Sequence, residues 1–206
     1  MIYIAIASIT PRLERCALHA IERTTPEPHR VIVVRGRPHG AALDFAFSNL
    51  PSDATYFVTM DDDAAPLKRG WLSWMLKQMG WLDYLTFGQN MVVGAVYCVP
   101  ALRDAWKIPY MMGSDIAGKA FSVTTNPGDA FRDALTGAYV PRDRGPWWLT
   151  NCEAYRDGEG ELVFAHLGGG TIGHTWRYQG KLYPRIPTWM WTFMVRRHLR
   201  RYVGPV

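Results

Sequence analysis

The chain has 206 residues, of which 48% are hydrophobic and 20% are charged. This balance excludes an intrinsically disordered protein, and the length suits one sizeable α/β domain. A small anionic ligand needs only local positive charge, so a formal net charge of +5 over the whole chain indicates a polyanion or an acidic surface as a partner.

Three widely spaced cysteines, Cys16, Cys98 and Cys152, form no CxxC motif. They are typical of reduced thiols in a cytoplasmic protein. No stretch reaches the roughly 18 uncharged apolar residues of a membrane-spanning helix, so we expect no transmembrane segment. The N-terminal run reads as a first strand and not as a signal peptide, because no charged residue precedes it. We therefore expect a cytoplasmic location.

Alternating apolar runs and amphipathic segments predict the elements of the first half of the chain. Residues 2–9, 29–36 and 55–60 are β-branched apolar runs and predict strands. A helix is expected from Arg12 onward, after a Thr-Pro start signal, and another over 40–50. This β-α-β-α-β order with short links predicts a right-handed, doubly wound parallel sheet.

The second half of the chain is less regular. We predict a helix over 67–82, a strand over 91–99, a strand over 161–167 and a helix over 188–203. Residues 100–150 are rich in Gly, Pro and aromatics, and predict loops, short helices and an edge hairpin. No linker or internal repeat is evident, so we expect a single domain.

Three consecutive aspartates, Asp61, Asp62 and Asp63, follow the strand over 55–60 directly. Adjacent carboxylates repel one another, and in sheets of this kind ligands collect at the carboxyl ends of the strands. A divalent cation such as Mg²⁺ or Mn²⁺ would compensate the charge. Side-chain alternation places Asp61 and Asp63 on one side, so they are the predicted metal pair, or one holds metal and the other a ribose hydroxyl. The alternative is a solvated acidic turn.

The stretches "ITPR", "GAALDFAFSNL" and "ATYFVTMDDDAAPLKRGWL" resemble the nucleotide-binding half of GT-A glycosyltransferases over residues 1–99. The resemblance implies an α/β fold: one Rossmann-like domain over 1–206 with a mostly parallel central sheet flanked by helices. Residues 1–99 would bind the nucleotide sugar, 100–187 the acceptor, and 188–206 would form a basic C-terminal helix. It also implies a DxD motif that holds Mn²⁺ or Mg²⁺ and the diphosphate of a nucleotide sugar, most simply a UDP-sugar.

The segment "GGGTIGHTWRY", 168–178, resembles a late family segment whose histidine is a metal ligand, which implies His174. Where many members carry an acidic residue that contacts the nucleobase, this chain has Arg35 or Arg37. Arginine suits the diphosphate, and Asp44 or the backbone near Thr10 is the alternative contact of the base. The expected donor-binding residues are Thr10, Arg12, Arg35, Asp44, Asp61 and Asp62.

An inverting transfer needs a carboxylate that accepts the proton of the acceptor hydroxyl, whereas a retaining transfer needs none in that place. Glu153, which follows the aromatic "PWWLTN", and Glu161 are the candidate bases. Asp157 and Glu159 are more typical of a polar turn. The stereochemical outcome stays open.

The tail combines aromatic residues with a cluster of arginines. Three interpretations remain: a membrane-surface helix, a nucleic-acid arm, or a helix packed on the domain with a solvated basic face. We expect a sugar transfer to a large anionic acceptor, with a hydroxymethylated pyrimidine in double-stranded DNA, as in phage-type enzymes, slightly favoured over a lipid-linked or lipopolysaccharide acceptor. The aromatic, apolar and basic residues of the tail are Trp189, Trp191, Phe193, Met194, Arg196, Arg197, Arg200 and Arg201.

Other protein classes fit less well. A haloacid-dehalogenase phosphatase carries its DxD motif after the first strand, and a P-loop enzyme needs GxxxxGK[ST], which is absent here. A nucleotidyltransferase usually has a Gly-rich segment where this chain has "SITPR". A basic nucleic-acid-binding protein without catalysis would leave three aspartates that repel phosphate.

Overall fold

The structure is a computed structural model that describes residues 1–37, 39–88, 94–105, 135–143, 152–167, 175–178, 181–184 and 186–204. Two compact units, each built from separate segments of the chain, account for these residues. The first contains Met1–Ser8, Glu27–Asp61 and Ser73–Pro141, and the second contains Ile9–Pro26, Asp62–Leu72 and Arg142–Val206. The single-domain organisation stays a prediction.

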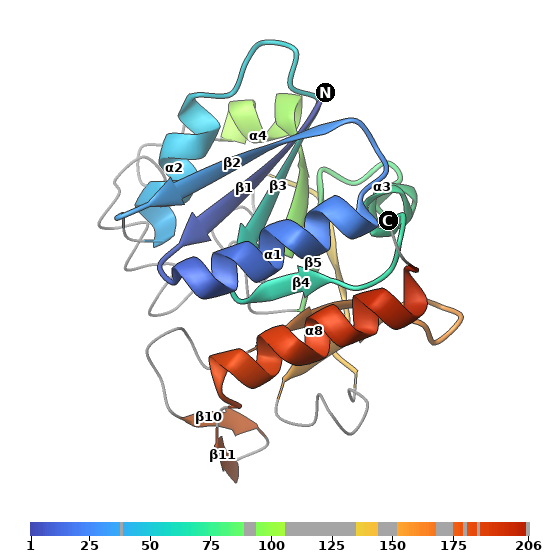
Figure 1. Cartoon of the computed structure of the whole chain (residues 1–206). Helices are drawn as coiled ribbons and strands as arrows, with labels where there is room; N and C mark the ends of the chain where they lie inside the picture. Colours follow the sequence, from blue (N-terminus) through green and yellow to red (C-terminus); the bar gives the residue numbers. More distant parts are fainter. Residues whose placement is uncertain are drawn as a thin grey trace. The chain divides into compact units, whose positions relative to one another are not determined.

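The first unit is built on a six-stranded sheet with the order β2-β1-β3-β6-β5-β7. Three of its strand pairs are parallel (β1–β2, β1–β3 and β5–β7), whereas β3–β6 and β5–β6 are antiparallel. The fold class expected from the sequence, α/β with a mostly parallel sheet and flanking helices, is confirmed (Figure 1). The strands are β1 (Ile2–Ser8), β2 (His29–Arg35), β3 (Tyr56–Asp61), β5 (Tyr84–Phe87), β6 (Gly94–Cys98) and β7 (Gly137–Val140).

Burial explains why the central strands read as unbroken apolar runs. Alternate residues of β1, Tyr3, Ala5 and Ala7, pack with residues of α2 (His39–Ser48) in one apolar core of the first unit. This core also includes Val99 and Leu102 of α4 (Val99–Ala105). Strands whose two faces are both covered need apolar residues at every position, because neither face meets water.

The second unit combines a three-stranded antiparallel sheet with two helices. The sheet has the order β4-β9-β8, and α1 packs against both β4 and α8, so that α1 and α8 lie side by side (Figure 1). An antiparallel hairpin, β10–β11, also belongs to this unit. The elements are α1 (Pro11–Thr24), β4 (Ala64–Pro66), β8 (Glu153–Arg156), β9 (Leu162–His166), β10 (Thr175–Tyr178), β11 (Lys181–Pro184) and α8 (Thr188–Tyr202).

Two local predictions need correction. The helix expected over 67–82 is α3, Trp71–Met79, and it begins later because Gly70 has a φ of 75°, a left-handed conformation outside the helical region. Leu67 still pairs with β9, since its backbone N–H donates to the Val163 carbonyl oxygen, and residues 68–70 then form a bend and turn. The fourth expected strand is β6, which runs antiparallel to β3, and β5 was not predicted.

None of the helices in the described parts of the chain is both long and apolar enough to span a bilayer.

Two tryptophans of α8 provide a direct test of this packing. Trp191 is 0% exposed in the core of the second unit, whereas Trp189, two residues earlier, is 55% exposed. We expect Trp191→Ala to lower the free energy of unfolding by about 3–5 kcal/mol, because it removes a buried aromatic side chain. Trp189→Ala should change it by less than about 0.5 kcal/mol. Urea denaturation followed by circular dichroism measures both, and equal losses would contradict the orientation of α8.

Candidate metal centre

The three consecutive aspartates contact three different partners. Asp61 ends β3 in the first unit, and its Oδ1 lies 2.7 Å from Nε2 of His39, which begins α2. Both side chains are partly exposed. His39 was not singled out in the sequence, where it lies in a short loop with no pattern of its own.

Asp62 holds the start of α1. It is buried, and its Oδ2 accepts hydrogen bonds from the backbone N–H groups of Ile9 and Thr10, at 2.8 and 2.7 Å. These two residues precede Pro11, the first residue of the helix. The carboxylate therefore satisfies main-chain donors at a helix N-terminus, where negative charge is also favoured by the helix dipole. Thr10 and Asp62, both expected to contact the donor, are bonded to each other in this way.

Asp63 belongs to a buried chain of hydrogen-bonding groups in the second unit. Its Oδ1 lies 3.0 Å from Nε2 of His166, and Nδ1 of the same imidazole lies 3.1 Å from Oε2 of Glu153. The three residues are 3%, 2% and 5% exposed, respectively. At the far end, Glu153 accepts hydrogen bonds from Arg142 Nη1 at 2.8 Å and from the Tyr155 hydroxyl at 3.0 Å.

Strand pairing brings these groups together. His166 ends β9 and pairs directly with Glu153, the first residue of β8, and with Ala64 of β4 on the other side. Asp63 immediately precedes β4, and its carbonyl oxygen accepts the backbone N–H of Leu167. Directly opposed residues on neighbouring strands have adjacent side chains. The register of β4, β9 and β8 thus places an imidazole between two carboxylates.

The two carboxylates control the charge of His166. Burial by itself would lower the pKa of the imidazole, but the charge and hydrogen bond of Asp63, followed by those of Glu153, raise it well above its usual value. Burial likewise acts to raise the pKa of Glu153, yet His166, Arg142 and the Tyr155 hydroxyl outweigh it and lower that pKa. Two carboxylates that face one imidazole thus favour positive charge on it.

His166 was missed by the sequence reasoning, which chose His174; that residue lies outside the described residues. One signal was available. His166 is a polar residue at the end of the apolar run "LVFAH", so it stands at the carboxyl end of a predicted strand, as the aspartates do.

The two candidate bases lie at opposite ends of one hairpin. Glu161 immediately precedes β9, whereas Glu153 pairs with His166, the last residue of β9. The length of β9 therefore places Glu161 about 16 Å from the position of Glu153. Glu161 is exposed and its Oε2 lies 2.7 Å from Lys68 Nζ, which also bonds to Asp157 at 2.5 Å. The polar-turn interpretation of Asp157 agrees with this, since its Oδ1 accepts the backbone N–H groups of Glu159 and Glu161.

The remaining predicted donor contacts lie on other elements. Arg35 is exposed at the end of β2, and Arg12 is exposed in the first turn of α1. Asp44 lies on α2 with both carboxylate oxygens buried, and this burial raises its pKa to about 6. Their roles in donor binding stay predictions.

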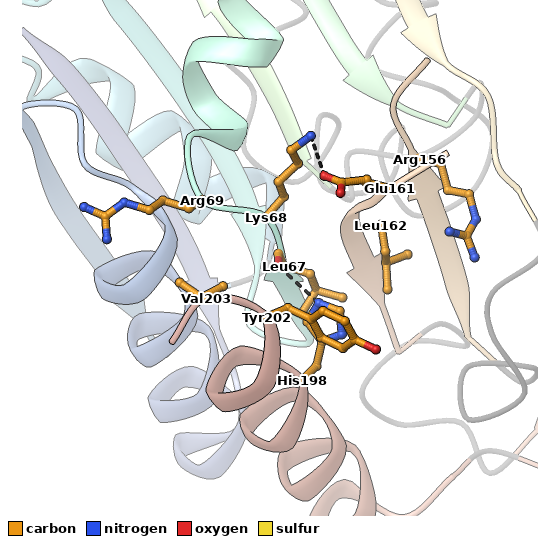
Figure 2. Close-up of a pocket in the computed structure, with 9 residues that line it drawn as sticks. All are labelled: Leu67, Lys68, Arg69, Arg156, Glu161, Leu162, His198, Tyr202 and Val203. Carbon is orange, nitrogen blue, oxygen red and sulfur yellow. Dashed lines mark hydrogen bonds and ion pairs between the residues drawn. The ribbon is translucent and has the colours of Figure 1, made fainter. Parts of the chain in front are cut away.

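A pocket of about 450 Å³ in the second unit is distinct from the Asp63–His166 pair (Figure 2). It lies at the Leu162 end of β9, whereas His166 ends the same strand. Figure 2 shows Lys68 turned toward Glu161, and Tyr202 and His198 facing the pocket from α8. Asp157 and Glu161 hold Lys68, so this lysine is not free to bind an anion in the pocket.

The donor set of the centre suits a divalent cation. A carboxylate oxygen is a hard ligand, and a neutral imidazole nitrogen is a borderline ligand, a combination that accepts Mn²⁺ more readily than Mg²⁺. A cation could take the place of the proton on Nε2, while Nδ1–H continues to donate to Glu153. This arrangement, in which a carboxylate orients a ligating histidine, recurs in metal centres.

Comparisons with known proteins were made at three levels. No family model matches the chain, and no curated protein matches it. Among solved structures, a glycosyltransferase involved in the glycosylation of the major capsid of PBCV-1 is 12% identical, covers 95% of this chain and 98% of its own, and has a TM-score of 0.48.

A mutant Drosophila β1,4-galactosyltransferase 7, in complex with manganese, UDP-Gal and xylobiose, is 13% identical, with 82% of this chain and 71% of that chain covered and a TM-score of 0.48. The 4-diphosphocytidyl-2C-methyl-D-erythritol synthase from Anaerococcus prevotii is 9% identical, with 71% and 90% covered and a TM-score of 0.49. At such identities and TM-scores the comparisons do not choose between sugar transfer and nucleotidyl transfer.

The structural role of Asp62 can be tested by its effect on stability. We expect Asp62→Ala to lower the free energy of unfolding by about 2–3 kcal/mol, because two backbone N–H groups lose a charged acceptor. Asp62→Asn should recover part of this loss, since its side-chain oxygen can still accept. Urea denaturation without any ligand measures both, and an unchanged stability of Asp62→Ala would contradict the structural role.

Proposed function

We propose that the protein is a metal-dependent glycosyltransferase that moves a sugar from a nucleotide-sugar donor to a hydroxyl acceptor. The observation that carries this proposal is the buried, hydrogen-bonded chain Asp63–His166–Glu153. Its first member, Asp63, is the last of the three aspartates that begin at the end of β3. The chain provides carboxylate and imidazole groups, both of which can act as ligands of a divalent cation that also binds a diphosphate.

Asp61 is kept as a third proposed ligand because only one residue separates it from Asp63 along the chain. The Cα atoms of residues two apart are separated by at most about 7 Å, so one cation is within reach of both aspartate side chains. When bound, the cation supplies Lewis acidity that stabilises the negative charge of the departing diphosphate. The chain's own contribution is to present three ligands and to exclude water from two of them, Asp63 and His166, which are buried.

The loop after β1 favours sugar transfer over nucleotidyl transfer. Nucleotidyltransferases usually bind a triphosphate with a Gly-rich loop at this position, whose backbone N–H groups point at the phosphates. Here the N–H groups of Ile9 and Thr10 donate to Asp62. They are not available to a triphosphate, so the donor diphosphate would depend on the cation and on side chains such as Arg12 and Arg35.

We further propose that Glu153 acts as a positioning residue for His166 and not as the catalytic base. Its carboxylate is buried and accepts hydrogen bonds from Arg142 and Tyr155, as well as facing Nδ1 of His166. It thereby directs Nε2 toward Asp63. The hydroxymethylated pyrimidine in DNA expected as acceptor stays a prediction, because no feature of this centre selects it.

A ligand screen tests the proposed reaction. We expect a nucleotide sugar, first of all a UDP-sugar, to raise the melting temperature in the presence of Mn²⁺ and not in its absence, because ligands that bind the native state stabilise it. UDP-, GDP-, CMP- and dTDP-sugars should be compared with CTP and UTP. Stabilisation by a triphosphate alone, together with pyrophosphate release, would instead identify a nucleotidyltransferase.

Variants of the proposed metal ligands can be tested by the same melting-temperature measurement and by donor hydrolysis. Asp63→Asn and His166→Gln should each abolish the Mn²⁺-dependent shift and reduce donor hydrolysis by at least about 100-fold, the upper range seen when only supporting residues of a metal site are changed. Asp143→Asn and His19→Gln, in the same unit, are matched controls that should behave as the unmodified protein. A retained shift in either ligand variant would contradict the proposed centre.

Glu153→Gln separates positioning from general base catalysis. If Glu153 orients His166, the substitution should weaken Mn²⁺ binding by about 10- to 100-fold, measured by calorimetry or by electron paramagnetic resonance of free Mn²⁺. A base would instead leave the Mn²⁺ affinity unchanged and reduce turnover alone. Glu161→Gln, at the other end of the hairpin, is the control and should leave the affinity unaltered.

A further inference from the structure

The outward face of α8 combines arginines with exposed aromatic side chains. Trp189 is 55% exposed and Phe193 is 58% exposed, and the arginines that follow them are exposed as well. No Asp or Glu occurs anywhere in the helix. Large exposed aromatics are unfavourable in water, so a face that displays two of them beside a cluster of like charges is typical of a binding surface.

Helical spacing gathers these residues on one side. Trp189, Phe193, Arg196 and Arg200 follow one another at intervals of four, three and four residues, which is one continuous stripe on an α-helix. The opposite side carries buried side chains that belong to the core of the second unit, namely Trp191, Val195 and Leu199. We call the stripe, with Arg197 beside it, the basic-aromatic face.

Helix α1 extends the positive charge of this face. It lies beside α8 and adds Arg12 and Arg15, which are exposed, and Arg23, which is half-buried (Figure 1). The pKa of His19 on α1 indicates that the arginines of α1 and those of α8 lie close together. Its pKa is lowered first by burial and then by Arg196, Arg23 and Arg200, while Glu22 acts in the opposite direction. Arginines of both helices therefore surround one position.

We propose that the basic-aromatic face docks on an anionic lipid bilayer, with α8 lying parallel to the membrane plane. The helix has 15 residues and is therefore about 22 Å long, and its arginines would face lipid phosphates and carboxylates. Trp189 and Phe193 would enter the interface between headgroups and acyl chains, where amphipathic helices place aromatic side chains. This proposal rests on the surface alone and not on the proposed sugar transfer.

The two aromatics favour a bilayer over duplex DNA. Binding to the phosphates of a duplex uses arginine and lysine and leaves exposed aromatics without a place, because the bases are stacked inside the helix. A bilayer surface accommodates both kinds of side chain at once: cations in the anionic headgroup layer and aromatic rings just below it. The arginines alone would fit either partner.

Vesicle flotation tests the proposal on the full chain. We expect binding to vesicles of 70% phosphatidylcholine and 30% phosphatidylglycerol, and much weaker binding to pure phosphatidylcholine. Arg196→Gln combined with Arg200→Gln should weaken binding by about 30-fold, since each arginine near an anionic surface contributes roughly a fivefold gain in affinity. Trp189→Ser combined with Phe193→Ser should also weaken it, by about tenfold or more.

Matched controls change the same residue types elsewhere. Lys77→Gln on α3 removes an exposed positive charge, and Trp81→Ser removes a tryptophan that is 82% exposed. Neither belongs to the basic-aromatic face, so neither should alter vesicle binding. Because all substituted side chains are exposed, the melting temperature should stay the same, which confirms that each variant is folded.

Three results would overturn the proposal. The first is no binding to the anionic vesicles. The second is binding that the aromatic pair of substitutions leaves unchanged, which would make the contact purely electrostatic. The third is tighter binding to a 20-base-pair duplex than to the vesicles at the same salt concentration, with the arginine pair required and the aromatic pair irrelevant, which would identify a nucleic-acid surface instead.

Discussion

The imidazole of His166, held between the carboxylates of Asp63 and Glu153, is the interaction on which the candidate centre depends. Two carboxylates cannot be buried this close together without a positive charge between them, because each would lose its hydration and repel the other. The structure meets this requirement with hydrogen bonds at both imidazole nitrogens. Arg142 and the Tyr155 hydroxyl also donate hydrogen bonds to the carboxylate of Glu153.

The three consecutive aspartates have different partners. Asp62 fastens the loop that begins α1, and Asp63 faces the imidazole, so only one of these two neighbours is available to a ligand. Asp61, which lies near His39, closes β3. Of three identical side chains in sequence, Asp62 thus has a structural role, whereas Asp61 and Asp63 remain the proposed ligands. The reason is that the chain turns at Asp62 and Asp63, between the end of β3 and the start of β4, so neighbouring side chains meet different partners.

The basic-aromatic face and the Asp63–His166 pair belong to the same unit, but their charges differ in sign. The buried centre places two carboxylates around one imidazole, whereas α8 and α1 display positive charge toward the solvent. In the proposed function, the buried centre would bind a cation and a small diphosphate through few contacts. A broad basic surface instead suits an extended anionic partner, to which many weak contacts contribute together.

Local patterns in the sequence determined most of the framework. The apolar runs of β1, β2 and β3 and the start signal of α1 were read correctly, because strand burial and helix capping depend on neighbouring residues. The aspartates were recognised as a candidate site for the same reason. The partners of the aspartates were decided by the tertiary structure alone. His166 lies about a hundred residues further along the chain than Asp63, and the register that pairs β9 with β4 and β8 is set by long-range packing that no local pattern records.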